Sequence, residues 1–168
     1  MSGSAASNAN TAGWEHFPQG ADIGVRGWGA TPAEAFAQAG HAVTAIVTHA
    51  DVKPSAAVEV RCEAPDIELL FVEWLNAIIY EMAVRAMLFA RFVVCIDGEK
   101  LIATLWGEPV DVARHTPACE PKGATLSLSQ MSSGWRGTAN RVMLSPDVGR
   151  LQSAVVAAHR VIPITSVT

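Results

Sequence analysis

Two stretches of the chain carry apolar residues at the spacing of an amphipathic helix. The first follows Thr31-Pro32-Ala33-Glu34, which supplies an N-cap, a proline at the first helical position and a capping-box glutamate, and it ends near Thr48. The second and longer stretch, 66–89, begins after Pro65. The spacing predicts two helices whose core-facing residues are Phe36, Ala39, Val43 and Ile46 or Val47 in the first, and Phe71, Leu75, Ile78, Met82, Ala86 and Phe89 in the second.

Other stretches show the period of β-strands. Residues 58–62 alternate apolar and charged side chains, as in a half-buried strand, and 23–29 form a shorter run broken by glycines. Residues 91–108 contain two apolar runs joined by Asp97-Gly98, a strong hairpin signal because both residues tolerate positive φ. This order of elements lacks the regular alternation of a parallel doubly wound sheet. We therefore predict a single compact α+β domain with two main helices packed on a mainly antiparallel β-sheet.

Composition narrows the function classes. The 168 residues suit one domain with one core. Lys and Arg number 12 against 16 Asp and Glu, a net charge of -4, so we expect no direct binding to nucleic-acid phosphates. Apolar residues reach 50%, yet no window of about 18 lacks charge or punctuation, so no membrane span is predicted. Residues 1–13 lack the basic and apolar regions of a secretion signal, so we expect a disordered leader and a cytoplasmic protein.

The cysteines favour neither a disulfide framework nor a zinc site. Cys62, Cys95 and Cys119 are an odd number, lie far apart and form no CxxC. Cys62 and Cys95 fall within predicted strands, and we expect them to be inert core thiols.

Four short stretches contain ionisable or amide side chains that could have a chemical role. Each also has a plain structural interpretation. Asp22 could cap a turn or pair with Arg26, four residues on. Glu73 and Asn76 could form a solvated strip beside an apolar helix face, and His115 could be a satisfied surface or loop histidine. The four stretches hold Asp22 and Arg26; Glu73 and Asn76; Glu108, Asp111, Arg114 and His115; and Glu120 and Lys122.

No motif with its own catalytic mechanism occurs. GxSxG, HExxH, GxxxxGK[ST] and GxGxxG are all absent, and no nucleophile with a neighbouring base can be chosen from spacing. The remaining candidates are the carboxylates Asp22, Asp111 and Asp147, which only folding could bring together. Such hard oxygen donors suit calcium, magnesium or manganese.

Taken together, four blocks of the chain resemble the archease family. They span 20–43, 63–81, 89–111 and 114–125, in the order and spacing of that family. The pair formed by "EWLN" and "RHxxxxExK", at 73–76 and 114–122, makes the resemblance specific.

The resemblance implies a fold, a role and a site. Archeases are compact α+β domains that act without catalysis of their own, as activators of the tRNA-splicing RNA ligase, which uses GTP and a divalent metal; they promote guanylylation of the ligase and its repeated turnover. The family also implies a metal site in which an aspartate, here Asp22, is joined by acidic residues of the C-terminal strand, here Asp147. The residues implied for site support or partner contact are Asp111, His115, Glu120 and Lys122.

The resemblance fades after Thr125. Trp135 and the segment 146–148 could be remnants of the family's ending, followed by a divergent tail, 149–168, in which 151–162 could form a short amphipathic helix. Either the tail is a real extension, or a shifted reading frame has replaced the last strand. We therefore divide the chain into the leader 1–13, an archease-like domain 14–148 and the tail 149–168.

Two other functions stay open. The first is a general protein chaperone or a modulator of an RNA-modifying enzyme, and a client-binding chaperone should expose apolar patches of several hundred square ångströms. The second is a small metal-dependent hydrolase that uses clustered carboxylates, although no general base can be named from spacing.

Overall fold

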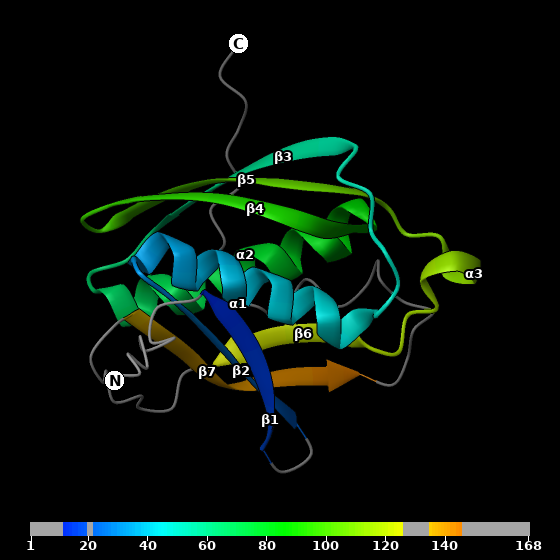
Figure 1. Cartoon of the computed structure of the whole chain (residues 1–168), viewed down its shortest axis with the longest axis horizontal. Helices are drawn as coiled ribbons and strands as arrows, with labels where there is room; N and C mark the ends of the chain where they lie inside the picture. Colours follow the sequence, from blue (N-terminus) through cyan, green and yellow to red (C-terminus); the bar gives the residue numbers. More distant parts are fainter. Residues whose placement is uncertain (1–11, 20–21, 126–134, 146–168) are drawn as a thin grey trace, which may run out of the picture.

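The computed structural model describes residues 12–19, 22–125 and 135–145. Within these ranges the chain forms two main helices, one short helix and antiparallel strands, which confirms the predicted α+β class (Figure 1). The elements are β1 (Gly13–Gln19), β2 (Asp22–Gly29), α1 (Pro32–Val47), β3 (Ala56–Glu63), α2 (Ile67–Arg85), β4 (Met87–Asp97), β5 (Lys100–Pro109), α3 (Val112–His115), β6 (Glu120–Thr125) and β7 (Trp135–Ser145).

The strands form two separate sheets. One has the order β1-β2-β7-β6 and the other β3-β5-β4, and every pairing is antiparallel. Figure 1 shows α1 and α2 between the two sheets, and α1 contacts strands of both. The helices therefore bury apolar residues on two sides. Trp74 and Leu75 of α2 are fully buried, and the Trp74 indole N–H donates to the carbonyl oxygen of Phe36 at 2.7 Å.

Helix α1 has the predicted beginning and end. The Thr31 hydroxyl accepts from the amide of Glu34 at 3.2 Å, and the Glu34 carboxylate reaches back to the amide of Ala30 at 2.7 Å. Thr48 is the C-cap. The predicted stripe of Phe36, Ala39, Val43, Ile46 and Val47 is buried, so this part of the fold follows from local signals.

Helix α2 begins as predicted but ends four residues early. Asp66 caps its first turn by accepting from the amide of Leu69 at 2.8 Å. At the other end Ala86 adopts the left-handed conformation, with φ 49°, and β4 begins at Met87. The predicted helical continuation to Phe89 is wrong because residues 87–89 pair with β5 and are buried there as a strand.

The hairpin formed by β4 and β5 confirms the predicted antiparallel pair. Asp97 pairs with Lys100, so the loop residues are Gly98 and Glu99, one position later than predicted. Gly98 has φ 60°. Further along β5, Gly107 allows a very close approach of the two strands, since a Cβ there would lie 1.8 Å from the Leu88 carbonyl oxygen.

The cysteines are free thiols in different surroundings. Cys62 of β3 is half-buried, and burial, followed by the negative charge of Glu73, raises its pKa to about 12. Cys95 of β4 is exposed, so the prediction of a core thiol is wrong there: from Phe92 onwards more buried and exposed residues alternate, and Cys95 lies on the outer face with Arg91, Val93 and Asp97. In the part of the chain that the structure covers, no helix is long and apolar enough to cross a membrane.

Candidate functional site

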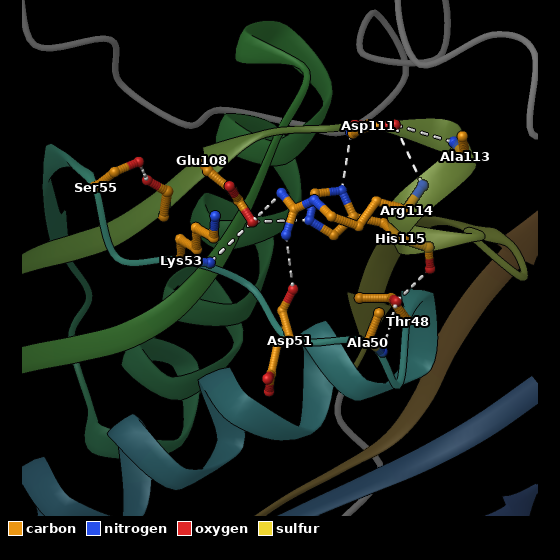
Figure 2. Close-up of polar contacts among 11 residues, drawn as sticks. Thr48, Ala50, Asp51, Lys53, Ser55, Glu108, Asp111, Ala113, Arg114 and His115 are labelled. Atoms are coloured by element: carbon orange, nitrogen blue, oxygen red, sulfur yellow. Dashed lines mark hydrogen bonds and ion pairs between the residues drawn. The ribbon is translucent and has the colours of Figure 1, made fainter.

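A buried carboxylate, Glu108, organises a polar cluster at the end of β5 (Figure 2). Its Oε1 accepts from the Arg114 guanidinium at 2.6 Å, from the backbone amide of Lys53 at 2.9 Å and from Nε2 of His115 at 2.9 Å. The Arg114 hydrogen bond, then the Lys53 amide, lower the Glu108 pKa to about 2, against the opposing effect of burial. The carboxylate is therefore ionised at neutral pH.

The hydrogen bonds of His115 define its tautomer. The side chain is fully buried, and its Nδ1 accepts from the backbone amide of Asp111 at 2.8 Å. Since a backbone N–H can only donate, Nδ1 carries the lone pair and Nε2 carries the hydrogen that is donated to Glu108. Both ring nitrogens are thus occupied within the fold. The histidine is satisfied, as the plain interpretation held, but it lies in the interior and not at the surface.

The cluster joins two segments that are distant in sequence, 48–53 and 108–115. Thr48, at the end of α1, donates its hydroxyl to the carbonyl oxygen of His115, and Arg114 donates to the carbonyl oxygen of Asp51 at 3.4 Å. Asp111 is exposed and caps α3 by accepting from the amides of Ala113 and Arg114. Asp111 and His115 therefore position the turn between β5 and β6, while Thr48 and the Lys53 amide were not found from sequence because they lie about sixty residues away.

The register of the larger sheet brings the other predicted residues to one end of the sheet. Ile23 of β2 pairs with Val142 of β7, and Val142 pairs with Ala124 of β6. Asp22 begins β2, one residue before Ile23, and Glu120 and Lys122 lie in β6 on the same side of Ala124. Neighbouring strands are about 5 Å apart. The backbones of these three residues therefore lie near the same end of the sheet.

The structure does not describe the side chains at this end of the sheet. This applies to Asp22, Glu120 and Lys122, and Asp147 falls in a range, 146–168, that is not described at all. Among the side chains that are described, no group of three or more His, Cys, Asp or Glu residues could hold a metal ion. The predicted ligand pair, Asp22 and Asp147, stays a prediction, as do the boundaries 1–13, 14–148 and 149–168.

Asn76 of α2 holds the strand that carries Glu120 and Lys122. Its side-chain carbonyl accepts from the amide of Ala124 at 2.7 Å, and its side-chain amide donates to the carbonyl oxygen of Ala124 at 3.1 Å. β6 is an edge strand, with β7 on one side only. Asn76 thus pairs with the open edge as a neighbouring strand would, and the interpretation as a solvated strip is wrong for this residue.

Arg26 of β2 has a carboxylate partner on a neighbouring strand. Its guanidinium pairs with Glu15 on the neighbouring strand β1 and lies 4.9 Å from the centre of the Phe17 ring. In the β1–β2 register Glu15 stands opposite Arg26, which explains this pairing.

Two antiparallel sheets with helices between them define the fold class, and a solved structure shares it. The solution structure of protein 1598 from Methanobacterium thermoautotrophicum aligns with a TM-score of 0.59, covering 76% of this chain and 96% of the other at 23% identity. At that identity the likeness shows the fold alone.

Sequence comparisons give the family. Archease proteins from Thermococcus gammatolerans and Pyrococcus abyssi are 35% and 32% identical over 117 residues, 67% of this chain and 82% of each relative. The archease of Ictalurus punctatus is 28% identical over 123 residues, 70% of this chain and 76% of its own. The model of the Archease protein family matches residues 14–144. This chain belongs to the archease family, as its resemblance predicted.

The family match also bears on the C-terminal part. It continues past Thr125, where the resemblance was expected to fade, and includes β7 almost to its end. β7 lies between β2 and β6, so it completes the larger sheet. A frame change at residue 125 would have replaced this strand, and the match to residue 144 argues against it.

Proposed function

We propose that this protein is a non-catalytic activator of a GTP- and metal-dependent tRNA-splicing RNA ligase. It promotes guanylylation of the ligase and its repeated turnover, and it contacts the ligase rather than the RNA. The observation that carries the proposal is the family match over residues 14–144.

The described polar cluster supports a role without catalysis. Glu108, Arg114 and His115 satisfy one another, and both ring nitrogens of His115 are engaged by Glu108 and the Asp111 amide. A general base needs a nitrogen or oxygen within hydrogen-bond reach of a substrate proton. This cluster instead fixes the turn that leads into β6, so the surface it supports is the functional element.

The sheet end that carries Asp22, Glu120 and Lys122 is the proposed contact with the ligase. The net charge of -4 gives no general attraction to RNA, which favours a protein partner. Carboxylates of the Asp22 and Asp147 type fit a hard cation such as calcium, magnesium or manganese. When bound there, the ion would supply positive charge beside the ligase nucleotide, and Asp22 with Asp147 would hold it.

A turnover assay tests the activator role. A GTP-dependent RNA ligase is incubated with labelled GTP and excess broken RNA, with and without this protein, and both the guanylylated ligase and the joined RNA are counted. The proposal expects more joined RNA per ligase when the protein is present. Equal numbers of turnovers with and without the protein would exclude the activator role.

Variants at the sheet end test the residues separately. Asp22→Ala and Lys122→Ala should each reduce activation by about tenfold or more, the scale found when groups around a metal site are removed. Asp51→Ala is the matched control, because Asp51 is exposed and Arg114 contacts it through its backbone carbonyl. If the wild-type protein activates and Asp22→Ala activates equally well, the role of Asp22 is wrong while the activator role stands.

The exposed apolar residues give little support to the chaperone alternative. Among the described residues, Val93 of β4 and Ile102 of β5 lie on the same outer face of adjacent strands, whereas Trp14, Leu69, Val84 and Val112 lie on β1, α2 and α3. A few exposed apolar residues of this kind are normal on a protein surface. A chaperone should instead suppress aggregation of an unrelated unfolded protein, which the activator is not expected to do.

A further inference from the structure

The outer face of the smaller sheet, β3-β5-β4, is exposed among the described residues. The two main helices lie on its inner side, between it and the larger sheet (Figure 1). Val93 of β4 and Ile102 of β5 are 49% and 47% exposed near the middle of the outer face, and the exposed Cys95 is the cross-strand neighbour of Ile102. A few exposed apolar residues do not by themselves indicate a partner, so the charges around them decide the matter.

The strand registers divide the outer face into four rows that run across the strands. In each row a residue of β5 has one neighbour from β3 and one from β4. Successive rows are two residues apart along the strands, which is about 7 Å. From one end of the sheet to the other, the rows are centred on Trp106, Thr104, Ile102 and Lys100.

The net charge of these rows alternates along the sheet. The row of Trp106 is positive, the row of Thr104 negative, the row of Ile102 positive and the row of Lys100 negative. The responsible side chains are exposed, so they remain charged in water. In the order of the rows they are Arg91, then Glu59, then Arg61, and last Lys100 between Glu63 and Asp97.

This order of charges is complementary to its own reversal. If a second copy packs the same face against the first with its strands reversed, each row meets a row of opposite charge. Arg91 then lies across from Asp97 of the second copy, and Arg61 lies across from Glu59 of the second copy. Rotation about one two-fold axis produces all of these pairs twice, because each copy supplies both members.

We propose that two copies of this chain associate through the outer face of β3-β5-β4, about a two-fold axis that runs across the strands. A two-fold contact of one surface with itself is the commonest arrangement in homo-oligomers. A second copy is favoured over a different protein because the face carries the complement of its own charge pattern. Packed sheets lie about 10 Å apart, so the side chains of Thr104 and Ile102 would fill the centre of the contact.

The dimer would leave the other sheet accessible. The sheet end that carries Asp22, Glu120 and Lys122 belongs to β1-β2-β7-β6, which lies across the helices from the proposed contact (Figure 1). The inference does not depend on the proposed ligase, and each can fail without the other.

The size of the face sets the strength of association. Three strands about 5 Å apart and four rows about 7 Å apart cover roughly 400 Å² per copy. The total of roughly 800 Å² is below the range of about 1,200–2,000 Å² that is typical of stable complexes. We therefore expect a weak dimer that forms at high protein concentration and dissociates as salt screens the charge pairs.

The exposed thiol of Cys95 reports on the arrangement. In the proposed dimer the two copies of Cys95 lie one row apart across the contact, within reach of a short bismaleimide cross-linker. Cys62 and Cys119 are half-buried and should react more slowly. Cross-linking of the full chain between about 10 µM and about 1 mM, followed by peptide mass spectrometry, should give a Cys95–Cys95 product, and sedimentation velocity should show a coefficient that rises over the same range.

Charge reversals test which residues pair. Arg91→Glu alone and Asp97→Lys alone each place like charges opposite one another twice, and each should lower the yield of the cross-link by roughly fivefold or more. An equal mixture of the two variants should recover it, since every negative side chain then faces a positive one in the mixed dimer. Arg85→Glu is the matched control, because it makes the same change of charge at an exposed position of α2, outside this face.

A second pair of variants repeats the test on β3. Arg61→Glu and Glu59→Lys should each weaken association, and their mixture should restore it by the same logic. Both positions are exposed and away from the hairpin turn, so this pair decides the matter if circular dichroism shows that Asp97→Lys disturbs the fold.

Three results would overturn the proposal. The first is a sedimentation coefficient that stays constant up to about 1 mM. The second is an equal yield of the Cys95 cross-link in the wild-type protein and in Arg91→Glu, which would show that the product arises from random collision. The third is a mixture of charge-reversed variants that associates no better than either variant alone.

Discussion

The two hydrogen bonds between Asn76 and Ala124 should make Asn76 one of the most sensitive half-buried positions in the protein. Asn76→Ala removes both bonds from the open edge of β6. Ala124 is only 5% exposed, so water reaches its amide and carbonyl groups poorly. The substitution therefore leaves two backbone groups without the partner that a sheet edge normally requires.

The magnitude follows from the two bonds and the groups left behind. A hydrogen bond contributes about 1 kcal/mol net, and a buried polar group left without a partner costs about 1–3 kcal/mol. Because Asn76 is half-buried and some water enters, we expect Asn76→Ala to lower the free energy of unfolding by about 2–4 kcal/mol in total.

Urea unfolding followed by tryptophan fluorescence measures this difference, with Trp74 on the same helix as a buried reporter. The matched control is Glu73→Ala, one turn earlier on α2. Burial raises the pKa of Glu73, so removing its carboxylate should change stability by no more than about 0.5 kcal/mol. If Asn76→Ala were as mild as Glu73→Ala, the pairing with β6 would contribute nothing and the reasoning would be refuted.

Asn76→Asp adds a pH signature. The ionised carboxylate can accept from the Ala124 amide but cannot donate to the Ala124 carbonyl oxygen, whereas the protonated acid can do both. The folded state therefore raises the pKa of the introduced group above about 3.9. The stability deficit relative to wild type should be smallest below that pH and should grow as the pH rises through the folded-state pKa. A deficit independent of pH would contradict the hydrogen-bond explanation.

Three other predictions concern the interior and the thiols. Glu108, whose pKa is lowered from 4.5 to about 2 chiefly by Arg114, stabilises the fold above its unfolded pKa, so stability should fall as the pH drops from 4.5 towards 2, and Glu108→Gln should flatten that part of the urea-unfolding profile. Gly107→Ala would place a methyl 1.8 Å from a backbone oxygen of β4, and it should destabilise the protein by several kcal/mol in urea or prevent expression of a folded chain. Cys62, with a pKa of about 12, should react with maleimide at pH 8 at least about tenfold more slowly than exposed Cys95 in a peptide-mapped time course.

The parts of the fold that were predicted correctly depend on local signals. The capping box before α1 and the apolar stripe within it both lie inside one short stretch, and the β4–β5 hairpin is marked by its own turn residues. The end of α2 was missed because Ala86 and Phe89 continue the helical spacing. What ends the helix is the left-handed conformation of Ala86 and the pairing of residues 87–89 with residues 107–109 of β5, at the end of the hairpin farthest from its turn.

The site was predictable only in part for the same reason. The stretch that contains Glu108, Arg114 and His115 was recognised as unusual, but the partners that bury it come from the end of α1 and the following loop. The sequence predicted a solvated position for Asn76, because the partner of its side chain is the backbone of Ala124, which has no signature in the sequence. Such backbone partners cannot be read from the sequence, because every residue except proline has the same N–H and C=O groups.

Backbone contacts position the segment that leads to the proposed ligase contact. The amide of Ala118 donates to the carbonyl oxygen of Val47 at 2.8 Å, the Asp111 amide binds His115, and both backbone groups of Ala124 bind Asn76. These contacts are made by backbone groups and by the side chains of His115 and Asn76. In the pattern "RHxxxxExK", Arg114 and His115 hold the turn, and Glu120 and Lys122 are the residues that we propose contact the ligase. Substitution of Asn76 should accordingly change stability, whereas substitution of Lys122 should change activation alone.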